Sequence, residues 1–222
     1  MTDGEDPVLA GQLRYYRARA DEYDDTSYGA ATAERASVGV VARTIEPLGD
    51  MLELACGTGI WTRELAPRAT SYLAIDGAPE MLARAREAVG DCPVEFELAD
   101  IFGYRPSRTY DTVFFAAWLS HVPESRFDEF WSVVDAALAP GGRAVCVDEL
   151  PSRAIHETGR DGDLATRTLR DGSRHRIVKV FWEPDELTAR LAAVGWTATV
   201  TPTVNDWFVA TAIRSNRHET AL

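Results

Sequence analysis

The sequence predicts an α/β protein with a seven-stranded, mostly parallel sheet and helices on both faces. Short apolar runs alternate with amphipathic helical patterns between residues 10 and 150, as in a chain of strand–helix units. The run at 111–117 is almost continuously apolar, which is typical of a central strand buried on both faces. After residue 150 the pattern changes, and two further strands at 197–203 and 206–213 are predicted to close the sheet, with an antiparallel strand at its end.

Residue types with known preferences place the remaining elements. Pro79 suits the first turn of a helix and Gly90 its end, while Pro67 ends the helix before it. A glycine pair, Gly141 and Gly142, is predicted to end the helix that precedes the fifth strand. We expect helices at 10–23, 31–46, 60–66, 79–89, 124–138 and 184–194, and the first five strands at 51–55, 71–75, 94–98, 111–117 and 143–147.

The composition excludes several classes of partner. The chain has 222 residues, with 23 Lys and Arg against 35 Asp and Glu, so its net charge is −12. This acidity argues against general nucleic-acid binding and against docking on anionic membranes, because both need a basic surface. No apolar run approaches the roughly 20 residues of a membrane span, and the acidic N-terminus lacks the apolar segment of a signal peptide. We therefore expect a cytoplasmic protein.

The three cysteines, Cys56, Cys92 and Cys146, predict neither disulfides nor a metal site. Their number is odd and their spacing fits no zinc or redox motif. Cys56 and Cys146 lie in apolar segments, where small buried thiols are common. We expect structural cysteines in a reducing compartment.

A glycine loop and two acids mark the expected ligand site. Gly57 and Gly59 lie between the first strand and the next helix, where glycine lets the backbone approach a ligand closely. Asp76 closes the second strand and Asp100 closes the third. An acid at the end of the second strand can accept hydrogen bonds from both hydroxyls of a ribose. Because ligands of open α/β sheets bind at the carboxyl edge, these three positions together predict a nucleoside site.

The loop favours a nucleoside that carries no phosphate. A dinucleotide fingerprint needs a third glycine, but Thr62 stands there and bulky Trp61 crowds the turn. No Arg or Lys in the loop would neutralise a pyrophosphate, and Glu53 and Asp76 make the surroundings acidic. S-adenosylmethionine, whose sulfonium is positive, fits these features. A nucleotide-dependent reductase is further opposed because Lys179 is the only lysine and belongs to no Tyr-x-x-x-Lys pair.

Five runs of residues occur in a characteristic order: ELACGTGIWTREL, AIDGAPEML, LADIF, YDTVFFAAWLSHVP and LAPGGRAVCVDE. Together they resemble the class I S-adenosylmethionine-dependent methyltransferases, especially the small-molecule enzymes of bacterial metabolism. The resemblance is strong over residues 10–150 and extends to 180–213 in pattern only. It implies a Rossmann-like fold and one domain over 1–222, with a helical lid at 1–46, a cofactor-binding core at 47–150, a substrate-recognition insertion at 151–180, and a C-terminal helix with closing strands at 181–214.

The resemblance also implies which residues hold S-adenosyl-L-methionine. The glycine loop would wrap the methionine portion, Asp76 would bind the ribose diol and Asp100 would meet the adenine amino group. In the family a tyrosine of the lid often touches the cofactor carboxylate, which makes Tyr15 and Tyr23 candidates; packing of an amphipathic helix is their alternative role. The implied cofactor residues are Tyr15, Tyr23, Glu53, Ala55, Gly57, Gly59, Asp76, Gly77, Met81, Asp100, Ile101, Ala116 and Ala117.

His121 is the predicted catalytic base. Methyl transfer from a sulfonium is an in-line displacement, so the protein mainly aligns the acceptor and excludes water. A hydroxyl or amine acceptor also needs a base, and histidine titrates near neutrality, whereas a carboxylate acceptor needs none. His121 follows the fourth strand, beside the expected position of the methyl group. Its alternative role is to cap the next helix or to pack in the wall.

The segment at 151–180 is the expected substrate-recognition element. It holds seven cations and four acids and is therefore +3 within a chain of −12. Guanidinium groups suit carboxylates and phosphates, which leads to the hypothesis that Arg153 and Arg170 hold an acidic group of the acceptor. An Asp-Gly pair after Arg170 predicts a hairpin turn, and an ordinary solvated hairpin is the alternative. The predicted substrate residues are Trp118, His121, His156, Arg153 and Arg170.

The function predicted from the sequence is methylation of a small molecule with S-adenosyl-L-methionine, which would leave S-adenosyl-L-homocysteine as product. O-methylation of a hydroxyl or carboxylate in bacterial secondary metabolism is favoured. N- or C-methylation and a non-catalytic S-adenosylmethionine-binding regulator are the alternatives. We expect a monomer or a homodimer, with neither nucleic acid nor a membrane as partner.

Overall fold

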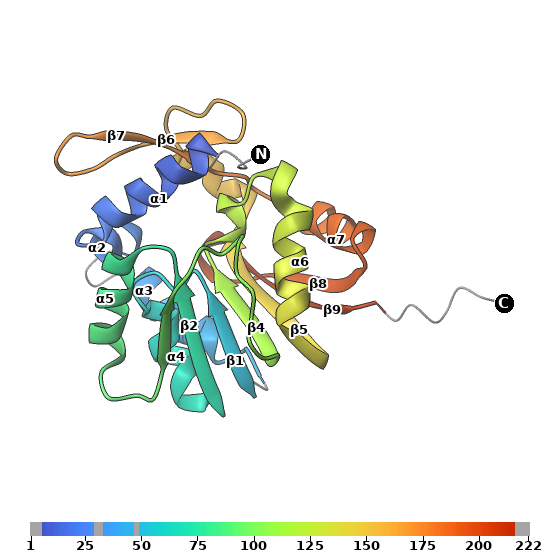
Figure 1. Ribbon diagram of the computed structural model, residues 1–222. Helices are drawn as coiled ribbons and strands as arrows, with labels where there is room; N and C mark the ends of the chain where they lie inside the picture. Colours follow the sequence, from blue (N-terminus) through green and yellow to red (C-terminus); the bar gives the residue numbers. More distant parts are fainter. Residues whose placement is uncertain (1–5, 29–32, 47–48, 216–222) are drawn as a thin grey trace, which may run out of the picture.

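The computed structural model describes residues 6–28, 33–46 and 49–215, and it confirms the predicted α/β sheet (Figure 1). The strand order is β3-β2-β1-β4-β5-β9-β8. Strand β9 pairs antiparallel with both of its neighbours, whereas the other pairings in the sheet are parallel. The strands are β1 (Asp50–Leu54), β2 (Ser71–Asp76), β3 (Glu95–Leu98), β4 (Tyr110–Ala116), β5 (Leu138–Glu149), β8 (Trp196–Pro202) and β9 (Trp207–Arg214).

Helices cover both faces of this sheet (Figure 1). Because successive strand residues point to opposite faces, Phe114 of β4 packs into one hydrophobic cluster while Val113 and Phe115 pack into the other. The central strand is thus buried on both faces, as its apolar run predicted. The cluster around Phe114 includes residues of α3 (Ala33–Ala42), α4 (Ile60–Leu65) and α5 (Pro79–Val89), and the opposite cluster includes α6 (Phe127–Ala137) and α7 (Pro184–Ala193).

The N-terminal helices and a β-hairpin lie together above the carboxyl ends of the parallel strands (Figure 1). The elements are α1 (Pro7–Arg19), α2 (Tyr23–Ser27), β6 (Leu164–Thr168) and β7 (Arg174–Val178). Buried Gln12 fastens α1 in place, because its Nε2 donates to the carbonyl of His121 at 3.1 Å and its Oε1 accepts from the Val178 N–H at 2.9 Å. Tyr15 packs between α1 and the hairpin with Ala165 and Ile177.

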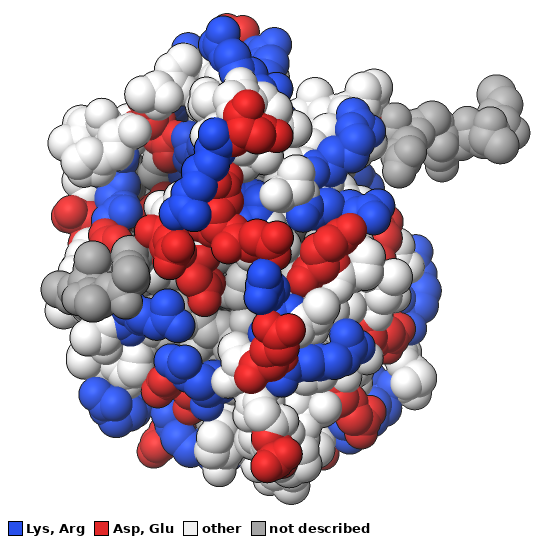
Figure 2. All heavy atoms as spheres, turned by 90° about the vertical axis from the view of Figure 1, so that its left-hand side faces the viewer, with Lys and Arg blue, Asp and Glu red and all other residues white. Residues whose placement is uncertain are grey.

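Ion pairs also join residues 7–28, which we call the lid from here on, to α5. Arg17 donates from Nη2 to Glu80 at 2.9 Å, and Arg84 donates to Asp21 at 2.5 Å. Figure 2 shows that acidic and basic side chains are interspersed on this side of the molecule. Because these pairs are exposed, each contributes at most about 1 kcal/mol to the attachment of the lid.

Three predicted boundaries are wrong. The helix expected at 10–23 is divided into α1 and α2, and the helix expected at 31–46 ends at Ala42. Helix α6 ends at Ala137, so Gly141 and Gly142 lie inside β5, where the register against β4 shifts. A Cβ on Gly142 would stand 3.0 Å from backbone carbonyl oxygens of β4 and β5, which explains the glycine there. Residues 31 and 32 of the helix expected at 31–46 lie outside the described residues.

Among the described helices, none combines the length and the apolar composition that a membrane crossing requires.

Candidate active site

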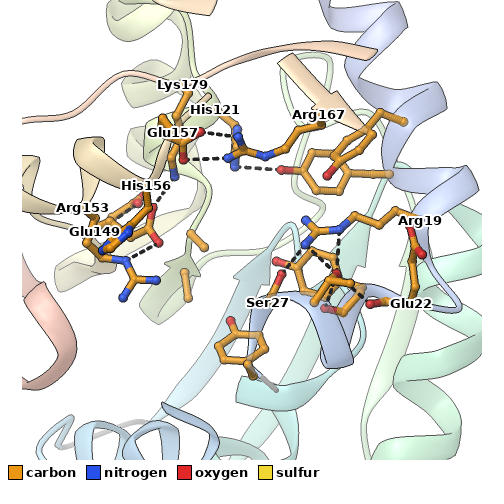
Figure 3. Close-up of a pocket in the computed structure, with 18 of the residues that line it drawn as sticks. Arg19, Glu22, Ser27, His121, Glu149, Arg153, His156, Glu157, Arg167 and Lys179 are labelled. Atoms are coloured by element: carbon orange, nitrogen blue, oxygen red, sulfur yellow. Dashed lines mark hydrogen bonds and ion pairs between the residues drawn. The ribbon is translucent and has the colours of Figure 1, made fainter. Parts of the chain in front are cut away.

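Two adjoining cavities lie at the carboxyl ends of the parallel strands. The first, of about 720 Å³, is lined by α1 and by the residues that end or follow β1, β2, β3 and β4. The second, of about 490 Å³, lies between α1, α2, the end of β5 and the hairpin (Figure 3). Both cavities are lined by Tyr16, Tyr23, Ala116, Ala117 and His121. The two cavities therefore meet at the end of β4, beneath the lid.

Backbone strain is concentrated in the wall of the first cavity. Ala55 and Ala117 have φ angles of 54° and 48°, in the left-handed region that alanine enters only at a cost. Gly57 has a φ of 56°, and a Cβ added to it would meet nothing within 4 Å. The loop after β1 thus presents its bare backbone to open space, which is the arrangement that a closely bound ligand needs.

Asp76 organises this loop. Its Oδ2 accepts from the Gly57 N–H at 2.9 Å and its Oδ1 from the Ala78 N–H at 2.8 Å. Burial raises the pKa of Asp76 to about 6, although the backbone hydrogen bonds act in the opposite direction. A carboxylate has about four acceptor positions, so acceptor capacity remains for ligand hydroxyls. Asp100, at the other side of the same cavity, is exposed and accepts from the backbone of Phe102 and Gly103.

These features fit the nucleoside that the sequence predicts. Asp76 and Asp100 supply acceptors for hydroxyl and amino groups at the first cavity. Arg126 is the one Arg or Lys among the described residues that line this cavity, and its guanidinium is held by Glu129 at 2.7 Å. The cavity therefore suits S-adenosylmethionine better than a ligand with a pyrophosphate. The described residues show no group of three or more His, Cys, Asp or Glu side chains placed to hold a metal ion.

Most of the predicted cofactor residues line the first cavity, namely Tyr23, Ala55, Gly57, Asp76, Gly77, Met81, Asp100, Ile101, Ala116 and Ala117. Their roles toward the cofactor stay predictions. Three other residues, Tyr15, Glu53 and Gly59, do not line it.

The structure shows other contacts for these three residues. Glu53 accepts from the Thr62 hydroxyl at 2.5 Å and from the Tyr72 hydroxyl at 2.9 Å, and burial raises its pKa to about 7. A Cβ on Gly59 would lie 2.8 Å from the backbone of α5, so this glycine permits close packing of two helices. Tyr15 lines the second cavity and packs against the hairpin. Glu53 and Gly59 thus hold together the elements around the loop, and Tyr15 packs the lid against the hairpin.

His121 stands at the junction of the cavities in a fixed tautomer. Its Nδ1 lies 2.7 Å from the Val178 carbonyl, which can only accept, so Nδ1 carries the proton. Its Nε2 therefore accepts from the Tyr16 hydroxyl at 2.8 Å. Burial lowers the pKa of His121 well below its usual value, so the imidazole is neutral, and burial raises the pKa of Tyr16. The Tyr16 hydroxyl thus occupies the acceptor position of Nε2 of His121.

The second cavity contains a buried network of charges (Figure 3). Glu149 lies 2.5 Å from the Nζ of Lys179 and 3.0 Å from the Nε of Arg153. Burial would raise the pKa of Glu149, but these cations outweigh burial and lower it. Lys179 is only 4% exposed and also lies 3.1 Å from the Oγ of Ser120. The hairpin therefore contributes to the cavity wall and is not merely solvated.

The predicted substrate residues do not all lie together. His121, Arg153 and His156 line the second cavity, whereas Trp118 lines the first. Arg170 lines neither; its side chain is 64% exposed and pairs at 3.3 Å with carboxylates of the lid. The turn after β6 directs Arg170 outward, so it joins the hairpin to the lid.

Several residues of the second cavity were not identified as site residues from the sequence, among them Tyr16, Arg19, Glu157 and Lys179. Lys179 belongs to the positive segment, and the charge of that segment was its only signal. Nothing in the sequence shows which face of α1 docks on the sheet, and that face decides the positions of Tyr16 and Arg19.

Comparison with known proteins agrees with this geometry. A family model of the methyltransferase domain matches residues 51–142. Trans-aconitate 2-methyltransferase of Escherichia fergusonii is 33% identical over 132 residues, which are 58% of this chain and 50% of that protein. The chain thus spans about half the length of this curated relative.

Two solved structures are similar over almost the whole chain. A complex of DhpI with S-adenosylhomocysteine is 42% identical, with a TM-score of 0.82, and the match covers 95% of this chain and 98% of that one. A complex of DhpI with S-adenosylmethionine and HEP is 41% identical, with a TM-score of 0.82 and coverages of 94% and 99%. Since these matches span both chains and the core matches the methyltransferase domain, the chain belongs to the class I S-adenosylmethionine-dependent methyltransferases.

Proposed function

We propose that this protein transfers the methyl group of S-adenosyl-L-methionine to an oxygen atom of a small acceptor. The observation that carries the proposal is the meeting of two cavities at Tyr16, Ala117 and His121. The first cavity holds the cofactor and the second holds the acceptor. When bound, the cofactor supplies a methyl group on a positively charged sulfur.

The residues of this chain then have three tasks. Asp76 accepts hydrogen bonds from the ribose hydroxyls while it holds the loop around Gly57. The lid covers both cavities and excludes water, since α1 is fixed by Gln12 to the chain near His121. The walls at Ala116 and Ala117 set the path along which acceptor and methyl group approach each other.

Removal of a proton falls to Tyr16 and His121 together. A hydroxyl of the acceptor gives its proton to the Tyr16 oxygen, and Tyr16 passes its own proton to Nε2 of His121. The acceptor oxygen would keep the lone pair that attacks the methyl carbon, and the cofactor, held at Asp76 and the loop around Gly57, would supply that methyl group and keep the electron pair of the carbon–sulfur bond on its sulfur. The role of His121 is thus retained from the sequence prediction, but through Tyr16. A carboxylate acceptor would bypass this relay.

The relatives favour oxygen as the acceptor atom. One curated relative is named for methylation of trans-aconitate, a small carboxylic acid. N- or C-methylation and a non-catalytic regulator remain the alternatives. Secondary metabolism, cytoplasmic location and the monomeric or dimeric state stay predictions.

The test is methyl transfer from isotopically labelled S-adenosylmethionine to a panel of small hydroxy acids, carboxylic acids and amines. We expect an O-methylated product together with S-adenosylhomocysteine, detected by mass spectrometry. For a hydroxyl acceptor Tyr16→Phe should lower kcat by about 100-fold and flatten its pH profile, as expected for loss of general base catalysis. Asp76→Asn is the matched cofactor variant, and it should weaken S-adenosylhomocysteine binding by roughly 100-fold, as expected for two lost charge-assisted hydrogen bonds.

Two results would contradict the proposal. Tight S-adenosylmethionine binding without turnover on any member of the panel would favour the regulator. Methylation of amines alone would assign the enzyme to N-methylation.

A further inference from the structure

The cations of the second cavity are not equivalent. Four Arg and Lys side chains line it: Arg19, Arg153, Arg167 and Lys179. Three of them are neutralised: Arg167 donates to Glu157 at 2.7 Å, Lys179 pairs with Glu149, and Arg153 pairs with Glu149 and with Glu34. Within the part of the chain that the structure describes, Arg19 forms no ion pair.

Arg19 is instead held by neutral groups. Its Nη2 donates to the hydroxyls of Thr26 and Ser27, both at 2.8 Å, and its Nε lies 3.2 Å from Thr26. The guanidinium also stacks over the ring of Tyr23, with 4.7 Å between its carbon and the ring centroid. These contacts fix the plane of the guanidinium without cancelling its charge. Its Nη1 makes no hydrogen bond to any described residue.

The acids of the cavity are engaged elsewhere. Glu22 pairs with Arg170 at 3.3 Å, and Asp148 accepts from the backbone N–H groups of Ser120 and Glu149 at 2.9 and 2.8 Å. Glu149 and Glu157 are already paired with the cations named above. The charge of Arg19 is therefore left for a ligand.

The position of Arg19 is next to the junction of the cavities. Tyr23, over which it stacks, lines both cavities, and the charge of Arg19 acts electrostatically on Tyr16 and His121. Figure 3 shows Arg19 pointing into the cavity from one side, while Glu149, Arg153 and His156 lie on the other. An anion held at Arg19 would thus stand close to the place of reaction.

We propose that Arg19 anchors an oxyanion subsite that takes a carboxylate or phosphoryl group of the methyl acceptor. The two N–H groups of Nη1, the nitrogen of Arg19 that Thr26 and Ser27 leave free, can donate charge-assisted hydrogen bonds to the oxygens of such a group. The inference rests on the proposed function, which makes the second cavity the acceptor site. The sequence suggested that Arg153 and Arg170 hold an acidic group of the acceptor, but both are paired with carboxylates. We therefore assign this role to Arg19 of the lid.

The test uses inorganic phosphate and acetate as separate probes, with the full-length protein and calorimetry or a thermal-shift titration. Wild type should bind at least one of the two anions, and Arg19→Gln should weaken that binding at least tenfold. Arg14→Gln is the matched control, because Arg14 is an exposed arginine of the same helix that lines neither cavity, and it should bind as wild type does. Arg19→Lys, which keeps the charge without the fork, should show intermediate affinity. Circular dichroism verifies that each variant is folded.

The outcomes separate cleanly. Loss of binding in Arg19→Gln alone supports the subsite, and the anion that binds identifies the group as phosphoryl or carboxylate. Equal binding by Arg19→Gln, equal loss in Arg14→Gln, or no binding by wild type would each overturn it. The binding assay does not depend on methyl transfer. If the protein binds an anion at Arg19 but fails in the separate methyl-transfer test, the subsite is supported and only the proposed function is contradicted.

Discussion

Glu53 and Asp76 beside the first cavity and Glu149 at the second have pKa values shifted in opposite directions. Beside the first cavity, Glu53 and Asp76 are stabilised by hydroxyl and backbone N–H groups, and burial raises their pKa values to about 7 and about 6. At the second cavity, Lys179 and Arg153 flank Glu149 and lower its pKa in spite of burial. The first half therefore suits a ligand that is itself positive, whereas the cations of the second half are paired with carboxylates, except that Arg19 has no such partner among the described residues.

The difference shows which part of the site tolerates a changed charge. Loss of a cation in the second half strands a buried carboxylate, and such a group is costly without its partner. Loss of an acid in the first half removes a carboxylate that no cation compensates, so the fold should tolerate it or gain from it. Three substitutions test this contrast.

Lys179→Met should have the largest effect on folding. It leaves the partly buried Glu149 with Arg153 as its remaining cation, and because loss of one partner of a fully buried pair lowers the free energy of unfolding by about 3–5 kcal/mol, the loss here should be at most about that size. Urea denaturation at pH 7.5 would measure it. The double variant Lys179→Met with Glu149→Gln should recover most of the loss, and Arg190→Gln, in an exposed pair, should cost less than about 1 kcal/mol. A single variant as stable as wild type would show that Glu149 does not depend on Lys179.

Glu53→Gln should have a smaller effect whose size depends on pH. Because the folded pKa of Glu53 is raised, the folded state binds the extra proton, and wild type loses stability as the pH rises from about 4.5 through about 7. Glutamine keeps the acceptor for Thr62 and Tyr72 but does not titrate. The free energy of unfolding of the variant, relative to that of wild type, should therefore increase by about 2–3 kcal/mol between pH 4.5 and pH 8.

Denaturation curves at several pH values would show this gain as a widening difference between the two proteins. Parallel stability profiles for variant and wild type would mean that Glu53 titrates normally in the folded state.

Arg170→Gln should have the smallest effect. Its side chain is 64% exposed and its pairs with Glu22 and Asp25 are loose, so the free energy of unfolding should change by less than about 1 kcal/mol. Calorimetry should show unchanged affinity for S-adenosylhomocysteine and for the anion probes of Arg19. A marked loss of anion binding would instead show that Arg170 binds the acidic group of the acceptor, as the sequence suggested.

The sheet and the first cavity could be predicted because their signals are local. The apolar run at 111–117, Pro79 and the glycines at 57 and 90 each act within a few residues of their position. Parallel strands also bring their carboxyl ends to one edge, so Asp76 and Asp100 could be placed together without any knowledge of packing. The prediction that Gly141 and Gly142 end a helix was wrong, because a glycine pair permits a strand irregularity as readily as a helix end.

The sequence by itself determined the fold class, the family and the edge of the sheet where the cofactor belongs. Only the tertiary structure decided that the Tyr16 hydroxyl bonds to His121, that Arg153 and Arg170 are already paired, and that Arg19 has no ion-pair partner among the described residues. These facts depend on how the lid and the hairpin dock on the strands, through contacts such as that of Gln12 with Val178, 166 residues apart. Periodicity and spacing carry no information about such pairs, because whether a charge is neutralised depends on which distant side chain lies beside it.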